Sequence, residues 1–101
     1  MKVFISHNMS SVDEETVKKI RAEATEYLRK TVGPNVEIID NYTHEDAPEN
    51  ADRLWHLGRS IQQIGEADAI YFVPGFSDAN GCIIERQVAL LYNLEVLDGS
   101  T

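Results

Sequence analysis

The sequence predicts an α/β domain in which a four-stranded parallel sheet is covered by helices on both faces. Short runs rich in β-branched and aromatic residues alternate with longer segments whose apolar residues recur at helical spacing. The resulting order, β-α-β-α-β-α-β, implies parallel strands joined by right-handed crossovers. We therefore expect a three-layer sandwich with strand order 2-1-3-4, formed by residues 1–101 as a single domain.

Four short, largely apolar runs are the predicted strands: Lys2–Ser6, Val36–Asp40, Ala69–Val73 and Leu94–Leu97. The first run is almost continuously apolar, as expected for a strand that is covered on both faces. The predicted strand order is that of a flavodoxin-like or Rossmann-like sheet with its switch point between strands one and three. Such sheets bind ligands at the carboxyl edge beside the switch point.

The first predicted helix begins at a capping box and ends at a glycine. Ser11 and Glu14 have the capping-box spacing, in which the serine accepts from the backbone and the glutamate reaches back to it. Gly33 followed by Pro34 is typical of a helix end. One face of the segment is apolar, formed by Val17, Ile20, Ala24, Tyr27 and Leu28.

Two more helices are predicted from apolar spacing. The second runs from about residue 51 to 66, and its apolar residues are Leu54, Leu57, Ile61 and Ile64. The third runs from about Cys82 to Tyr92, and we expect it to turn Ile84, Val88 and Leu91 toward the core. Asn93 follows it, and we expect this residue to end the helix in the left-handed backbone conformation.

Composition excludes several classes of function. A net charge of −8 disfavours nucleic-acid polymers and anionic lipid, whereas a single nucleoside or nucleotide needs only local donors. We expect no membrane span, because no apolar run approaches the roughly 20 residues required, and no charged-then-apolar leader is present. The single Cys82 excludes an internal disulfide and a cysteine metal cluster, which fits a reducing cytoplasm. His44 and His56 lack the spacing of metal ligands, so we expect neither a metal nor a cofactor.

The candidate site lies where the loops after strands one and three meet. These loops are Ser6–Ser10 and Pro74–Gly81, and Glu85 follows in the first turns of the last helix. A carboxylate in the first turns of this helix would face the cleft between the two loops. The free N–H groups at the start of a helix stabilise an anion. From spacing alone, Glu85 either complements the helix dipole or serves the pocket. Cys82, at the same helix start, is either a buried small hydrophobe or a thiol with a lowered pKa.

These residues resemble the nucleoside 2-deoxyribosyltransferase-like superfamily, in particular its short members from bacteria and phages. The resemblance is carried by the start KVFIS, the run IQQIGEAD at residues 61–68, and the PGF loop that leads to Gly81 and Glu85. In the catalytic members a glutamate at the start of the last helix attacks the anomeric carbon of a nucleoside, and a second base or water then takes the sugar. The resemblance implies this nucleophilic role for Glu85, four residues after Gly81.

The sequence departs from that family at two positions. The family's catalytic aspartate falls on Ser60, and a serine hydroxyl can hydrogen-bond a base but cannot act as a general acid near neutral pH. The carboxylate that family transferases carry before the glutamate falls on Ala79, with Asp78 and Asn80 beside it. These departures leave open whether the chain is an enzyme.

The resemblance also implies a set of substrate-binding residues: Ser6, His7, Asn8, Ser60, Gly75, Phe76, Asp78, Asn80 and Gly81. Several have a second interpretation. Phe76 either stacks on a base or plugs the end of the sheet, and Asn80 either caps the last helix or bonds a ribose hydroxyl. A lone loop histidine such as His7 is more often solvated than functional, and Asp68 is expected to cap or to bond loop amides.

Three functions follow from these observations. The first is binding of a nucleoside or nucleotide, with N-glycosidic bond cleavage or deoxyribosyl transfer through Glu85. The second is a non-catalytic nucleotide sensor, suggested by Ser60. The third is an acidic protein-interaction domain, suggested by the loop Glu45–Asp52. In each case we expect a homo-oligomer, because four strands leave sheet edges and apolar helix faces to cover.

Overall fold

Four parallel strands form the central sheet, and their order confirms the predicted topology. The computed structural model describes residues 1–7, 13–39, 47–74 and 80–98. Its strands are β1 (Lys2–Ser6), β2 (Glu37–Ile38), β3 (Ala69–Phe72) and β4 (Glu95–Asp98), and they are arranged β2-β1-β3-β4. All three pairings are parallel. Because β1 and β3 are the two inner strands, the switch point lies between them, as expected.

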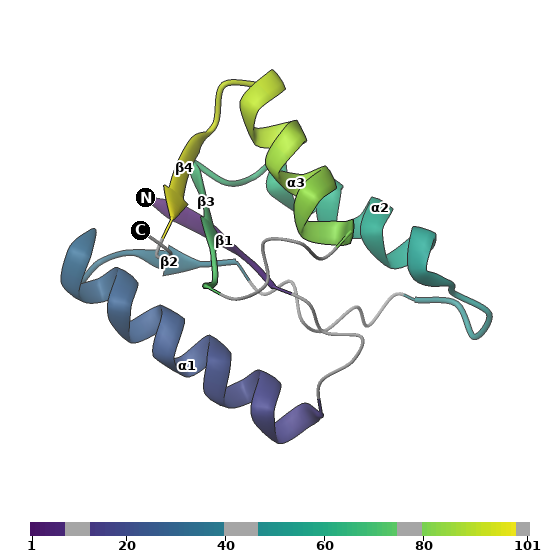
Figure 1. Cartoon of the computed structure of the whole chain (residues 1–101), viewed down its shortest axis with the longest axis horizontal. Coiled ribbons are helices and arrows are strands. Elements are labelled where there is room, and N and C mark those ends of the chain that lie inside the picture. The colour runs from purple at the N-terminus through teal and green to yellow at the C-terminus, as the bar shows by residue number, and fades with distance from the viewer. Residues whose placement is uncertain (8–12, 40–46, 75–79, 99–101) are drawn as a thin grey trace.

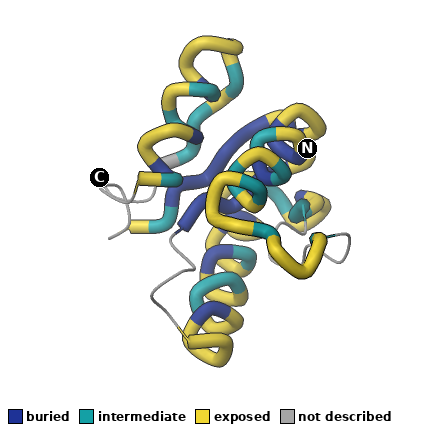
Figure 2. Tube along the Cα trace, turned by 90° about the vertical axis from the view of Figure 1, so that its right-hand side faces the viewer, coloured by how far each residue is buried: buried dark blue, intermediate teal, exposed yellow. Residues whose placement is uncertain are grey.

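Three helices cover the sheet from both sides, which completes the predicted three-layer sandwich. They are α1 (Glu14–Thr31), α2 (Arg53–Ile64) and α3 (Asn80–Leu91). Figure 1 shows α1 on one face of the sheet and α2 and α3 together on the other. The two inner strands, β1 and β3, are almost entirely buried, whereas Glu37 of β2 and Glu95 of β4 are exposed (Figure 2).

The alternation of side chains along the inner strands divides the core into two clusters. Val3 and Ile5 of β1 point toward α1, where they pack with Ala24 and Leu28. Phe4, between them in sequence, points to the opposite side and belongs to the cluster that includes residues of α2 and α3. Ser6 therefore shares the face of Phe4, which is the face that α3 covers.

The ends of β2, β3 and β4 differ from the prediction by one or two residues, whereas β1 has the predicted bounds. The second strand pairs over Glu37 and Ile38 only, although the bond from Ile39 N to Val3 O continues the ladder by one step. Asp40, predicted to end this strand, lies outside the described residues. The third strand ends at Phe72, one residue early.

Capping residues account for where the helices begin and end. Asp13, not Ser11, is the N-cap of α1, because its carboxylate accepts from Thr16 N at 2.7 Å; Ser11 lies outside the described residues. Asp52 caps α2 in the same way. Gly33 follows α1 with a φ of 153°, which only glycine adopts readily. Asn93 follows α3 with a φ of 59°, which confirms that this residue ends the helix in the left-handed conformation.

The prediction for the buried face of α3 is wrong. Ile84 and Leu91 are exposed, and Val88 is half-buried. The buried residues are Cys82, Glu85 and Ala89. Apolar residues lie on every side of this helix, so their spacing does not define one face. The small Cys82 and Ala89 let the helix approach the sheet closely. On α2, Leu54 is also exposed rather than packed inward.

Two features that would point to a class of function are absent from residues 1–7, 13–39, 47–74 and 80–98. None of the helices in the described part of the chain is both long and apolar enough to cross a membrane. Within the same residues, no three acidic, histidine or cysteine side chains gather where they could hold a metal ion.

Candidate functional site

The carboxyl ends of β1 and β3 meet beside the amino-terminal half of α3. Ser6, the last residue of β1, lies in register with Phe72, the last residue of β3. Glu85 lies in the second turn of α3, on its buried face. The fold thus brings together two residues that are 79 positions apart in the sequence, at the edge where open α/β sheets bind ligands.

The side chains of Ser6 and Glu85 form a direct hydrogen bond. The Ser6 hydroxyl donates to Oε1 of Glu85 at 2.6 Å, a short distance typical of a hydroxyl that bonds a carboxylate. Glu85 is 6% exposed and Ser6 is 1% exposed, so the bond is shielded from water. A buried carboxyl group that is bound by a hydroxyl, rather than by a lysine or arginine, keeps both of its protonation states accessible.

Cys82 is the third member of this cluster. Its Sγ lies 3.2 Å from Oγ of Ser6, one helical turn before Glu85, and the thiol is buried and not in a disulfide. A serine hydroxyl has one proton to donate. When Glu85 is ionised, that proton points to the carboxylate and the thiol can donate to Oγ. When Glu85 is protonated, the carboxyl can donate to Oγ and the hydroxyl proton can turn to the sulfur.

Burial dominates the acidity of Glu85. Removal from water disfavours the charged form, and it raises the pKa of Glu85 from 4.5 to about 7. The hydrogen bond from Ser6 acts in the opposite direction, because it stabilises the carboxylate, but it offsets only part of the rise. At neutral pH this carboxyl group is therefore present in both forms.

His7 and Arg21 lie on the other side of the sheet. His7 is buried, and its Nε2 lies 3.4 Å from NH1 of Arg21, whose second terminal nitrogen donates to the carbonyl of Ile39 at 3.4 Å. Since successive side chains of a strand alternate, Ser6 faces α3 and His7 faces α1. His7 is thus held by a guanidinium group, and it is not a solvated loop residue.

Sequence reasoning missed Arg21. The residue is half-buried on α1 and reaches the carboxyl ends of β1 and β2. Its spacing contained the signal, because Val17, Arg21, Ala24 and Leu28 follow one another at four, three and four residues. A cation in the middle of an inward stripe indicates a buried partner.

The remaining predicted residues fall into two groups. Ser60 is buried in α2, Asn80 is exposed at the first residue of α3, and Gly81 follows it. A Cβ added to Gly81 would meet no atom within 4 Å, so packing does not require glycine there. The other predicted binding residues lie outside the described part of the chain: Asn8, Gly75, Phe76 and Asp78.

Asp68 has a structural role. Its carboxylate accepts from the backbone N–H of Lys2 at 2.8 Å, which ties the entry of β3 to the start of β1. This bond agrees with the expectation that Asp68 bonds backbone amides, and it lies at the amino edge of the sheet, opposite the candidate site.

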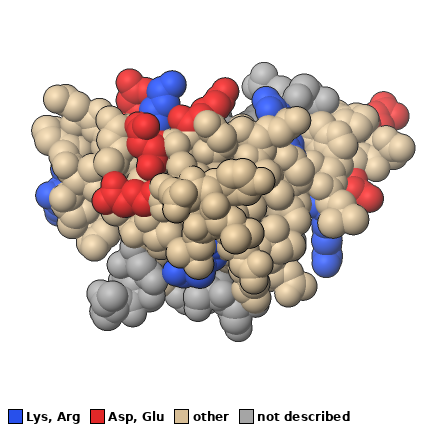
Figure 3. Space-filling view, turned by 90° about the horizontal axis from the view of Figure 1, so that it is seen from above, with Lys and Arg blue, Asp and Glu red and all other residues tan. Residues whose placement is uncertain are grey.

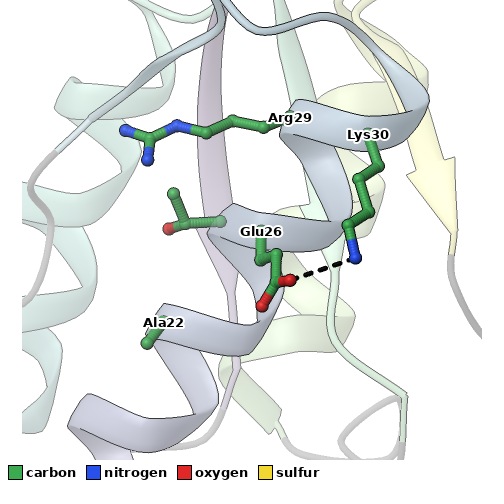
Figure 4. A pocket seen from close by; sticks show the side chains of 5 residues that line it. Ala22, Glu26, Arg29 and Lys30 are labelled. Carbon is green, nitrogen blue, oxygen red and sulfur yellow. Dashed lines mark ion pairs between the residues drawn. The ribbon is translucent and has the colours of Figure 1, made fainter.

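A surface hollow of about 570 Å³ lies elsewhere, along α1 (Figure 4). Its lining residues all come from this one helix: Ala22, Thr25, Glu26, Arg29 and Lys30. Glu26 and Lys30 form an exposed ion pair at 3.0 Å across it. A ligand pocket normally buries most of its ligand between several elements. The hollow is therefore a gap between surface side chains, and it contains none of the predicted site residues.

Fold and site together define this chain as a small parallel α/β domain with a buried carboxyl–hydroxyl–thiol cluster at the carboxyl edge of its sheet. Comparison of the sequence with protein-family models and with curated proteins found no match.

Proposed function

We propose that the site binds a nucleoside or nucleotide and that Glu85 acts on the N-glycosidic bond. One observation carries this proposal: a carboxyl group that has no structural ion pair to explain it among the described residues is held by Ser6 at the carboxyl end of the central strand β1. The resemblance to the nucleoside 2-deoxyribosyltransferase-like superfamily supports the same role. The net charge of −8 disfavours a nucleic-acid polymer, whereas a single nucleotide needs only local donors.

In the proposed reaction, a carboxylate oxygen of Glu85 forms a bond to C1′ of the sugar while the bond from C1′ to the base nitrogen breaks. The base leaves with the electron pair of that bond and is protonated by water. Water, or a second base, then attacks C1′ and releases the carboxylate. The negative charge of Glu85 stabilises the oxocarbenium-like transition state as well.

Ser6 positions the nucleophile in this scheme. Its hydroxyl fixes one carboxylate oxygen at 2.6 Å and leaves the other for the sugar. Only the ionised form of Glu85 can attack. Because its pKa is about 7, the proposal predicts a rate that rises as the pH passes through neutrality.

The decisive experiment measures release of free base from a panel of 2′-deoxynucleosides and their 5′-monophosphates, with and without an acceptor base. We expect the wild type to release base and Glu85→Gln to lose at least about a hundredfold of the rate, because the amide cannot become a nucleophile. Glu66→Gln, the same change at an exposed glutamate, is the matched control. Release by Glu85→Gln at the wild-type rate, or none by the wild type, would contradict the enzymatic proposal.

A non-catalytic nucleotide-binding module is the second candidate, and it is favoured by Ser60. This buried residue occupies the place of the family's catalytic acid and cannot supply a proton near neutral pH. In such a module the protonated Glu85 would donate a hydrogen bond to the ligand. Binding without turnover, measured by calorimetry with the same panel and weakened by Glu85→Ala, which removes the donor, would support it. An absence of binding by every compound in the panel would contradict both candidates.

We also infer a cytoplasmic location for this function. The chain has one cysteine, and Cys82 is a buried thiol that is hydrogen-bonded to Ser6 and not in a disulfide. Such a residue fits a reducing compartment.

A further inference from the structure

The outward face of α3 is apolar, which is the reverse of an ordinary surface helix. Four large aliphatic side chains are exposed on it: Ile83 (43%), Ile84 (41%), Leu90 (64%) and Leu91 (75%). The only charged residues of α3, Glu85 and Arg86, both turn toward the sheet, where Glu85 meets Ser6 and Arg86 lies over the ring of Phe72 at 4.3 Å. A surface helix normally turns its apolar side chains to the core and its charged ones to water, so a contiguous apolar outward face marks a surface that a partner covers.

The spacing of side chains on this face is symmetric about one residue, which suits a second copy of the same helix. Along the helix, Ile83 and Ile84 precede the exposed Gln87 by four and three residues, and Leu90 and Leu91 follow it by three and four. Gln87 is thus the centre of an apolar stripe. If two copies of α3 lie antiparallel about a two-fold axis at Gln87, the isoleucines of one copy meet the leucines of the other.

Gln87 suits that central place. A side-chain amide carries both a donor and an acceptor, so two facing glutamines satisfy each other. No charged side chain of α3 lies in the stripe, so two copies meet without like-charge repulsion despite the net charge of −8. In helical assemblies a polar residue at the centre of an apolar seam fixes register and orientation. A self-complementary surface of this kind is the requirement of an isologous contact.

The exposed apolar side chains supply about half of the area that a stable dimer buries. The four of them expose the equivalent of a little over two large residues. At about 200 Å² for each, this is roughly 450 Å², and a standard interface buries about 800 Å² on each partner, with a polar rim around its apolar core. The face of the molecule seen in Figure 3 has a broad uncharged area in its middle, with acidic side chains above and to the left of it and others at the right edge.

We propose that the protein forms a two-fold symmetric homodimer through the outward face of α3, with Gln87 of the two copies facing each other at the axis. The inward face of the same helix carries Glu85. Dimerisation therefore holds the helix that positions the candidate site, although the dimer does not depend on the proposed function.

Sedimentation equilibrium over a wide concentration range tests the dimer. We expect the wild type to dimerise and Leu91→Glu to weaken the association about a hundredfold or more, because each glutamate would be buried against the partner's apolar residues. The matched control is Val32→Glu, which places the same charge at an exposed valine that follows α1, on the other side of the sheet. A strictly monomeric wild type, or equal dimerisation of Leu91→Glu and wild type, would overturn the proposal.

A mixing experiment tests the axis itself. Gln87→Glu and Gln87→Lys should each dimerise weakly alone, because like charges would face each other, and should associate when mixed, because opposite charges would then meet. Circular dichroism of each variant verifies that it is folded. Failure of the mixture to associate more tightly than either variant alone would show that Gln87 does not face its own copy.

Discussion

Helices α1 and α3 cover opposite faces of one sheet but distribute their polar residues in opposite ways. On α1, Leu28 is fully buried and the ion pairs Glu14–Lys18 and Glu26–Lys30 lie in solvent. On α3, Glu85 is buried and Leu91 is in solvent. Only α1 has the pattern that stability alone would select. The comparison teaches that α1 supports the fold, whereas α3 gives up part of its packing to present a carboxyl group to the end of β1.

The largest expected difference between the two helices is in stability, when the same leucine-to-alanine substitution is made on each. Leu28→Ala should lower the free energy of unfolding by about 2–5 kcal/mol, because it opens a cavity in the core. Leu91→Ala should change it by no more than about 0.5 kcal/mol in dilute monomeric protein. Urea titration at low protein concentration measures both. Equal losses would remove the distinction between the two helices.

The charge of Glu85 should make stability depend on pH. Its pKa is about 7 when folded and 4.5 when exposed, so the unfolded chain gives up this proton at lower pH. The contribution of Glu85 is fully present below its unfolded pKa and is lost as the pH rises through 7, a change of about 3 kcal/mol.

Glu85→Gln should lack that part of the pH dependence, whereas Glu66→Gln, altered at an exposed site, should keep it. Urea unfolding of the three proteins between about pH 4 and pH 8 gives the difference. Parallel curves for wild type and Glu85→Gln would mean that Glu85 is hydrated in the folded protein.

Removal of the Ser6 hydroxyl should have a smaller effect, in a defined direction. The bond from Ser6 lowers the pKa of Glu85, so Ser6→Ala should raise that pKa further. We expect a cost of about 1–2 kcal/mol in stability above pH 8, where the ionised carboxylate loses its donor. A carbon-detected NMR titration of the glutamate side chains measures the midpoint. A midpoint that falls would contradict the assigned bond.

The exposed ion pairs of α1 should matter least. Lys30→Gln removes the pair with Glu26, and both side chains are about 70% exposed. We expect a change of less than about 0.5 kcal/mol, since solvent screens such pairs. The variant should also leave any nucleotide binding unchanged, because the hollow along α1 is not the proposed site. Weakened nucleotide binding in calorimetry would indicate that the hollow along α1 takes part in binding.

Strand order and layers could be predicted because alternation and apolar runs report directly on parallel sheets. Lys2–Ser6 has the same bounds in the sequence prediction and in the structure. The buried face of α3 could not be predicted in this way, because apolar residues on all sides give no single direction. The buried Glu85 is hydrogen-bonded to Ser6. This contact joins distant segments of the chain, so no local spacing reveals it.

The candidate site was predicted in part. The place of Glu85 beside the end of β1 follows from topology, whereas its bond to Ser6 and the proximity of Cys82 do not. Arg21 was overlooked because the inward face of this helix was defined from its apolar residues alone, although the spacing of Arg21 places it between Val17 and Ala24.

The adjacent residues Glu85 and Arg86 fix how α3 is rotated about its own axis relative to the sheet. One residue reaches β1 through Ser6 and the next reaches β3 through Phe72. Since each residue turns a helix by about 100°, inserting a single alanine before Cys82 would swing both groups off their strands at once. This helix should therefore tolerate exchange of its outer side chains far better than any change in its length.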